Sequence, residues 1–174
     1  SGPVLLVSNH VSLMDALVIG GSVRRPVRFV MDHRIFRTPV LRFIFRTARA
    51  IPIAPAHEDE QLLNQAFERI DAELAAGEVV CIFPEGKLTT SGDLNVFRGG
   101  VERILARRQV PVVPLALRGL WGSFFSRRAG AAMRRWPRSF WSRIELVAGP
   151  TVAPQAASAT MLQVKVAELR GDWR

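Results

Sequence analysis

A histidine and an aspartate near the start of the chain are the first side chains whose types and spacing could do chemistry. His10 and Asp15 stand in residues 9–15, which read NHVSLMD. A carboxylate bound to one imidazole nitrogen fixes the ring's tautomer and stabilises the imidazolium, so the other nitrogen can take a proton from a hydroxyl. On an ideal helix this spacing leaves the two side chains roughly 140° apart. They therefore meet only if His10 lies on a turn before the helix that carries Asp15. The alternative is that each residue only caps a local element.

A second polar segment follows an apolar stretch much later in the chain. Residues 79–83 read VVCIF, which is typical of a buried strand, and Pro84 ends that strand because proline has no N–H for a central ladder. Glu85, Gly86 and Lys87 come next. Open α/β sheets bind ligands at the carboxyl ends of their strands, and glycine lets a ligand approach the backbone. This turn is therefore a candidate to hold a polar or anionic substrate, the alternative being an ordinary exit from a strand.

Strands and helices that could position these residues alternate along the chain. We expect short apolar strands at residues 3–7, 27–31, 50–53, 79–83, 112–117 and 144–148. We expect helices at residues 13–19, 38–46, 58–76, 99–108 and 159–169. In the first helix Ser12 is the expected N-cap, and Gly20 and Gly21 are expected to end it. This alternation predicts a single α/β domain with a mixed, largely parallel sheet flanked by helices.

Three short stretches of the sequence resemble the signatures of the glycerolipid and lysophospholipid acyltransferases. Residues 9–15 are similar to the first signature of that family, residues 83–86 (FPEG) to its third, and residues 110–114 (VPVVP) to its fourth. The resemblance covers nearly all of the 174 residues. It implies acyl transfer to a glycerolipid hydroxyl, with an acyl thioester as co-substrate and no further cofactor. It also implies that His10 is the base, that Asp15 orients it, and that Glu85 and Gly86 help to hold the acyl acceptor.

The residues expected to bind substrate come from the same segments and from one nearby arginine. They are Asn9, Ser12, Arg49, Phe83, Glu85, Gly86, Lys87 and Thr89. Two arginines that the family often has are absent, since Pro55 stands where the second signature often ends in Arg and the third signature continues with Lys87. Their loss weakens the case for a bare phosphomonoester acceptor. Lys87 or Arg49 could compensate as a point charge, without the bidentate geometry of the missing arginines.

Two further stretches are similar to one subgroup of the family. Residues 87–94 and 119–126 resemble the acyltransferase part of the bacterial acyl-acyl carrier protein synthetase/2-acylglycerophosphoethanolamine acyltransferase proteins. This resemblance favours a lysophospholipid acceptor, with acyl carrier protein or acyl-coenzyme A as donor. The alternative is an acylglycerol-phosphate acyltransferase of phosphatidic acid synthesis. Because the chain begins Ser1-Gly2 without Met, we expect residues 1–174 to be one acyltransferase domain excised from a longer chain.

The chain is basic, and its positive charge is concentrated in two regions. It has 24 Lys and Arg against 15 Asp and Glu, a net charge of +9. Residues 103–144 hold ten Arg and no Asp or Glu among Trp and Phe residues, which suits the headgroup layer of an anionic membrane. We therefore expect peripheral docking through residues 103–144 at the cytoplasmic face of the cell membrane. A solvated basic surface and an acidic acyl carrier protein are the alternatives. Residues 24–49 hold eight Arg. We expect this segment to be a helix with a solvated basic side. The alternative is a second contact with lipid headgroups or substrate phosphate.

Other classes of function lack support in the sequence. No helix-turn-helix, zinc-finger or RNA-recognition signature occurs, so we expect no nucleic-acid partner. The three histidines have no Cys or carboxylate at ligand spacing, so we expect no metal site. Cys81 is the only cysteine and is expected to be a packed apolar side chain. A non-catalytic module that binds anionic membranes or an acidic partner remains the alternative of another class.

Overall fold

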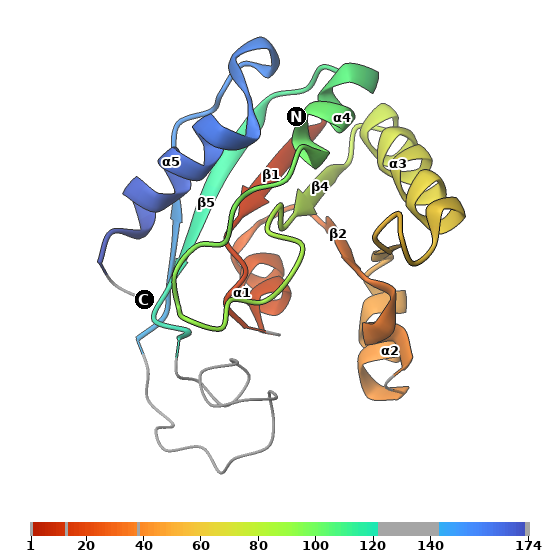
Figure 1. Cartoon of the computed structure of the whole chain (residues 1–174), viewed down its shortest axis with the longest axis horizontal. Helices are drawn as coiled ribbons and strands as arrows, with labels where there is room; N and C mark the ends of the chain where they lie inside the picture. The colour runs from red at the N-terminus through yellow and green to blue at the C-terminus, as the bar shows by residue number, and fades with distance from the viewer. Residues whose placement is uncertain (1, 13, 38, 122–142, 173–174) are drawn as a thin grey trace.

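The computed structural model describes residues 2–12, 14–37, 39–121 and 143–172, and its centre is one six-stranded sheet (Figure 1). The strand order is β3-β2-β4-β1-β5-β6. The strands are β1 (Val4–Ser8), β2 (Val27–Asp32), β3 (Ile51–Ile53), β4 (Val79–Ile82), β5 (Val112–Arg118) and β6 (Glu145–Ala148). All neighbouring pairs are parallel except β5 with β6, which is antiparallel. The predicted α/β fold with a mixed, largely parallel sheet is confirmed.

Helices cover both faces of this sheet. On one face lie α3 (Glu60–Ala75), α4 (Gly100–Arg107) and α5 (Ala159–Arg170), whose apolar residues share a core with β1 and β4. On the other face lie α1 (Asp15–Ser22) and α2 (Pro39–Thr47), with a second core that includes Phe29 and Phe83. Two short 3-10 helices, η1 (His33–Arg37) and η2 (Pro154–Ala156), complete the elements of the described residues. The central strands β1 and β4 are buried on both sides, which explains their continuous apolar sequences.

Two helices begin at the side-chain caps that their sequences supply. The carboxylate of Asp59 accepts a hydrogen bond from the N–H of Leu62 at 2.8 Å and starts α3. The hydroxyl of Ser158 accepts one from the N–H of Met161 at 3.2 Å and starts α5. At the edge of the sheet, β3 is only three residues long, and its central residue Pro52 pairs with Met31 of β2.

Helix α1 differs from the prediction at both of its ends. It begins at Asp15 after Met14, which makes no side-chain cap, and the Ser12 hydroxyl accepts from the N–H of Met14 at 3.1 Å instead. The prediction of Ser12 as N-cap is therefore wrong. The helix also runs through Gly20 and Gly21 to Ser22, so the predicted stop is wrong as well. Helices tolerate glycine at a cost of about 1 kcal/mol, and a Cβ at Gly20 would contact the ring of Phe29 at 3.5 Å.

Two predictions about basic regions have different outcomes. Residues 24–49 do not form a single helix, because they contain β2, η1 and α2. Most of the predicted docking region at residues 103–144, and most of the family-like stretch at residues 119–126, falls in residues 122–142 and lies outside the described residues. Within the part of the chain that the structure describes, no helix is long and apolar enough to cross a membrane.

Candidate active site

The fold brings His10 and Asp15 into direct contact. His10 lies on the loop after β1, and Asp15 is the first residue of α1. The Nδ1 atom of His10 lies 2.8 Å from Oδ2 of Asp15. The side chain of Asp15 is fully buried, whereas that of His10 is 15% exposed. The two side chains meet because the imidazole precedes the helix, which is the arrangement that the spacing predicted.

The Asp15 carboxylate is held by the backbone before it. Oδ2 accepts the N–H of Val11 at 2.7 Å, and the N–H of Ser12 lies 3.0 Å from both carboxylate oxygens. These donors compensate for the removal of a carboxylate from water. When Nδ1 carries a proton and donates it to Asp15, Nε2 is the nitrogen with a free lone pair. The geometry therefore provides an oriented base on the partly exposed side of the ring.

An aromatic side chain stacks on the imidazole of His10. Phe83, at the end of β4, stacks on His10 with ring centroids 4.4 Å apart and planes 22° apart. Phe29 of β2 lies next to Phe83, with centroids 6.5 Å apart. This row of rings limits rotation of the imidazole and connects the base to the core beneath α1 and α2.

Glu85 is buried and fixes the backbone of the base. Its Oε1 accepts the N–H of His10 at 2.7 Å, and its Oε2 accepts the N–H of Asn95 at 2.7 Å and the Asn95 side-chain amide at 2.8 Å. The residue is 1% exposed. Burial raises the pKa of the Glu85 carboxyl, and the N–H donors of His10 and Asn95 act in the opposite direction. Glu85 thus ties the loop after β1 to the segment between β4 and α4.

Asn9, Ser12 and Thr89 are also buried and bonded within the protein. The Asn9 amide donates to the carbonyl of Leu117 at 3.0 Å and accepts the N–H of Leu117 at 2.7 Å, which joins the end of β1 to β5. The N–H of Thr89 donates to the carbonyl of His10 at 3.1 Å, and the Thr89 hydroxyl accepts the N–H of Gly92. The three residues were predicted to bind substrate, and in the structure their polar groups contact backbone atoms of the protein.

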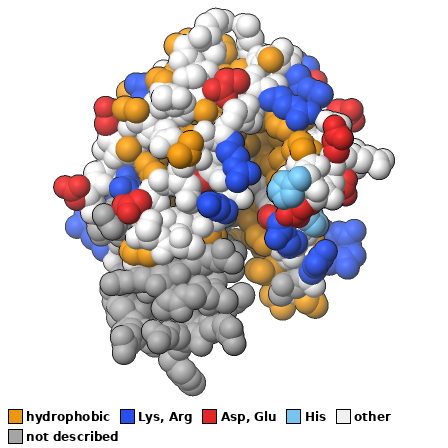
Figure 2. All heavy atoms as spheres, viewed as in Figure 1, with side chains coloured by type: hydrophobic (Ala, Val, Ile, Leu, Met, Phe, Trp, Pro, Cys, Tyr) orange, Lys and Arg blue, Asp and Glu red, His pale blue; other side chains and the backbone are white. Residues whose placement is uncertain are grey.

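The exposed members of the site are Gly86, Lys87 and an arginine that the sequence analysis missed. The guanidinium of Arg98 lies 3.4 Å from the position of a Cβ on Gly86, whose φ is +67°. Among the residues that the structure describes, Lys87 and Arg98 have no side-chain hydrogen bond or ion pair. Figure 2 shows basic side chains beside a hollow with an apolar floor on this face. The sequence signal for Arg98 was only its place, with Asn95, in the irregular stretch before α4.

Among the described residues, Arg49 makes no hydrogen bond or ion pair with His10, Asp15 or Glu85, and its predicted role in substrate binding stays a prediction. Arg49 precedes β3, whereas His10 and Glu85 follow β1 and β4. The register of the parallel strands places Ile51, the first residue of β3, level with Ile82 of β4 and Val7 of β1, but β2 and β4 lie between β3 and β1. Over the described ranges, no three His, Cys, Asp or Glu side chains gather closely enough to hold a metal ion.

Comparison with known proteins places the chain in a family. A protein-family profile described as "Acyltransferase" matches residues 1–118. The chain belongs to the acyltransferase family. The residues that match contain β1 to β5 and every candidate site residue described above. The acyltransferase profile therefore covers the part of the chain that forms the site.

Individual relatives agree with this assignment. The chain is 30% identical over 117 residues to a chloroplastic 1-acyl-sn-glycerol-3-phosphate acyltransferase of Brassica napus, covering 67% of this chain and 33% of the relative. It is 30% identical over 115 residues to a lyso-ornithine lipid O-acyltransferase of Pseudomonas aeruginosa, covering 66% and 43%. The chain thus spans less than half the length of these relatives. The crystal structure of the 1-acyl-sn-glycerophosphate acyltransferase PlsC from Thermotoga maritima has the same fold, with a TM-score of 0.72 and 20% identity over 100% of this chain and 69% of that one.

Proposed function

We propose that this acyltransferase-family chain moves a fatty acyl group from an acyl thioester to the free hydroxyl of a lysophospholipid. The observation that carries the proposal is the 2.8 Å contact between Nδ1 of His10 and the buried Asp15 carboxylate. Family membership and relatives named for acyl transfer to glycerolipids or lysolipids support it. The acyl carrier is acyl carrier protein or coenzyme A, no further cofactor takes part, and the reaction runs at the cytoplasmic face of the cell membrane.

In the proposed reaction His10 acts as general base. Nε2 accepts the proton of the lysophospholipid hydroxyl while that oxygen attacks the thioester carbonyl. Asp15 stabilises the imidazolium that forms. The tetrahedral intermediate then collapses: the new carbon–oxygen bond is kept, the carbon–sulfur bond breaks, and the imidazolium proton passes to the leaving sulfur. Because the substrate hydroxyl attacks directly, the enzyme needs no nucleophile of its own.

The surrounding residues take two kinds of role in the proposal. Asn9, Ser12, Glu85 and Thr89 are positioning residues, because their polar atoms bind the backbone around the base. Phe83 orients the imidazole by stacking. Gly86, Lys87 and Arg98 face solvent beside the base and suit the phosphate of the acceptor, since cations without a protein partner attract an anion.

The acceptor headgroup has two candidates. The relative from Brassica napus is named for acyl transfer to 1-acyl-sn-glycerol 3-phosphate, so this phosphomonoester is the second candidate. A phosphodiester lysolipid is preferred because residues 87–94 resemble the 2-acylglycerophosphoethanolamine acyltransferases. Both carry a phosphate that Lys87 and Arg98 could bind.

The test is acyl transfer by wild type and His10→Ala. Each protein is incubated with lysophosphatidylethanolamine or lysophosphatidate and with an acyl-acyl carrier protein or acyl-coenzyme A, and thiol release and product mass are measured. Loss of the base should reduce transfer by roughly 100-fold to 10,000-fold. His57→Ala is the matched control, because His57 is on the surface with a side chain 79% exposed, and it should transfer normally. Full transfer by a folded His10→Ala protein would refute the assignment of the base.

A further inference from the structure

Helix α2 presents apolar side chains to solvent on its outer side. Its Phe45 is buried and Leu41 and Ile44 pack against the core, which attaches one side of the helix to the molecule. On the outside, Val40 is 68% exposed and Phe43 is 73% exposed. These two residues are three positions apart, so they lie on the same side of the helix. An exposed aliphatic and aromatic pair of this kind is typical of a surface that binds another apolar phase.

The same helix carries arginines without acidic partners. Residues 33–57 contain no Asp or Glu. Arg34 pairs with Asp32 and Glu58. Within the described part of the chain, four further arginines of this segment form no ion pair and make no side-chain hydrogen bond, namely Arg37, Arg42, Arg46 and Arg49. The basic charge around α2 is therefore not neutralised by the protein itself.

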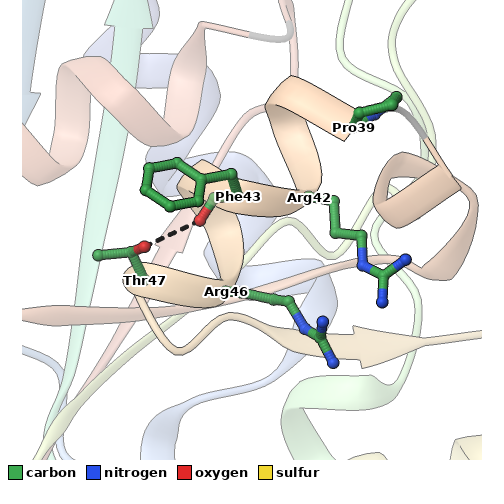
Figure 3. Close-up of a pocket in the computed structure, with 5 residues that line it drawn as sticks. All are labelled: Pro39, Arg42, Phe43, Arg46 and Thr47. Atoms are coloured by element: carbon green, nitrogen blue, oxygen red, sulfur yellow. Dashed lines mark hydrogen bonds between the residues drawn. The ribbon is translucent and has the colours of Figure 1, made fainter.

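Figure 3 shows how these side chains are arranged. The side chains of Arg42 and Arg46 extend together, and the ring of Phe43 points away from them. With Pro39 and Thr47 they line a surface hollow of about 460 Å³. Figure 1 shows α2 projecting from the body of the molecule. An exposed apolar side chain and two nearby guanidinium groups on a projecting helix match the boundary between acyl chains and headgroups in a bilayer.

We propose that the outer side of α2, formed by Val40, Phe43, Arg42 and Arg46, docks on the surface of an anionic phospholipid bilayer. Val40 and Phe43 enter the layer at the level of the upper acyl chains. Arg42 and Arg46 bind lipid phosphates, whose charge complements the unpaired arginines. A second copy of this chain is a poor partner for the outer side of α2, because contact between two such surfaces would bring like charges together in a protein of net charge +9.

Docking through α2 would place the candidate site near the bilayer. α2 lies beside α1 across a hollow of about 320 Å³, which Leu17 and Gly21 of α1 line together with Ile44 of α2. Phe29 lines the same hollow and stands at the far end of the aromatic row that begins at His10. The helix that begins with Asp15 is therefore the neighbour of the docking helix. The docking surface itself does not depend on the proposed acyl transfer.

The test is co-sedimentation with vesicles of phosphatidylcholine alone and of phosphatidylcholine mixed with phosphatidylglycerol. Wild type should bind the mixed vesicles and bind phosphatidylcholine much more weakly. Replacing two arginines near the surface should weaken binding to mixed vesicles roughly 30-fold in Arg42→Gln/Arg46→Gln. Val40→Ser/Phe43→Ser should weaken it by about tenfold, and this loss should persist in high salt because apolar burial is not screened.

Matched controls lie on the opposite face of the sheet. Arg69→Gln/Arg107→Gln removes the same charge from exposed positions of α3 and α4, and Val164→Ser removes an exposed apolar side chain of α5. Both should bind vesicles within about twofold of wild type, since they are remote from the proposed surface. Circular dichroism spectra and thermal melts check that every variant is folded.

Three results would overturn the proposal. The first is vesicle binding that both α2 variants retain in full. The second is a wild-type dimer that Val40→Ser/Phe43→Ser converts to a monomer in light scattering. The third is binding to acyl carrier protein, and not to vesicles, that Arg42→Gln/Arg46→Gln abolishes. Acyl transfer to a short-chain, monodisperse lysolipid is measured in parallel. Absence of this transfer in wild type would count against the proposed function. Loss of vesicle binding in the α2 variants would support docking whether or not transfer is seen.

Discussion

A buried carboxylate holds the backbone of the residue that supplies the base. Glu85 belongs to the turn that the family resemblance connected with the acyl acceptor, yet both of its oxygens are bonded within the protein. It accepts three hydrogen bonds from His10 and Asn95 and is 1% exposed. At the scale of single residues, its influence on chemistry therefore acts through the position of His10.

Glu85→Gln should destabilise the protein and slow the reaction. The new amide group is a donor, and each position it could take faces an N–H of His10 or Asn95, so at least one buried donor loses its acceptor. The expected loss in the free energy of unfolding is about 1–3 kcal/mol. Urea unfolding measures the stability, and steady-state kinetics should record a lower kcat with little change in KM. Glu68→Gln on the exposed side of α3 is the control. A Glu85→Gln protein as stable and active as wild type would contradict the role.

The same residue should give the stability a pH dependence. Burial raises the pKa of Glu85 above its ordinary value of 4.5, so the folded protein keeps this proton at pH values where the unfolded chain has lost it. The contribution of Glu85 to the free energy of unfolding therefore falls as pH rises from 4.5 towards the raised value. The stability of wild type minus that of Glu85→Gln should decrease over this window in urea titrations. A difference that increases with pH would show that the carboxylate is stabilised by folding.

Arg98 should matter for the acceptor and not for the fold. Its guanidinium lies over Gly86, and it forms no ion pair among the described residues. Losing one charge-assisted contact of about 1.5–3 kcal/mol should raise the KM for a lysophospholipid by roughly tenfold or more in Arg98→Ala. Monoacylglycerol, which has no phosphate, should be unaffected. Arg107→Ala on α4 is the control, and an unchanged KM for the lysophospholipid in Arg98→Ala would remove Arg98 from the acceptor site.

At the scale of elements, the irregular segment between β4 and α4 covers the base. Its residues Glu85 and Thr89 bind the backbone of His10, and Gly92 donates its N–H to the Thr89 hydroxyl. Gly92 has a φ of +86°, and a Cβ there would lie 2.7 Å from the indole ring of Trp121. The segment can therefore adopt this conformation without strain only with glycine at position 92.

Gly92→Ala should disturb this segment. Positive φ and the clash with Trp121 together should cost about 1–3 kcal/mol, with lower activity because Thr89 moves relative to His10. Gly21→Ala is the matched control, since no atom lies within 4 Å of its Cβ position and alanine favours a helix. Thermal unfolding should show a lower midpoint for Gly92→Ala and an unchanged or higher one for Gly21→Ala. Equal thermal-unfolding midpoints for wild type and Gly92→Ala would show that alanine is not strained at position 92.

The sequence was sufficient for the elements and for the contact between His10 and Asp15. The strands were found to within about two residues because runs such as VVCIF are buried on both sides, and caps such as Asp59 lie close to the expected helix starts. The start of α1 was wrong because the Asp15 carboxylate, and not the Ser12 hydroxyl, accepts the N–H groups of Val11 and Ser12 before the helix. Its end was wrong because a glycine costs a helix only about 1 kcal/mol, so α1 continues through Gly20 and Gly21 to Ser22. Asn95 and Arg98 were missed because their contacts depend on how an aperiodic segment folds back onto the turn. The burial of Glu85 was missed for the same reason.

At the scale of the whole molecule, Cys81 should report on global unfolding. It is the only cysteine of the chain, lies in β4 near the centre of the sheet, and is fully buried. Burial raises the pKa of its thiol, which lowers the amount of reactive thiolate. A disulfide reagent should react with native protein only as fast as it unfolds, and the rate should rise with urea along the unfolding transition. Rapid, complete labelling under native conditions would contradict this.

The edge strand β3 also affects the tendency of the protein to aggregate at high local concentration. β3 has three residues, and the middle one is Pro52, which has no N–H. A short edge strand of this kind offers too few donors for a strand of another molecule to pair with it in register. Strands of other molecules therefore cannot easily extend the sheet by pairing with β3. For a protein that we propose to gather on lipid surfaces, a built-in barrier to aggregation at this position would help to keep it dispersed.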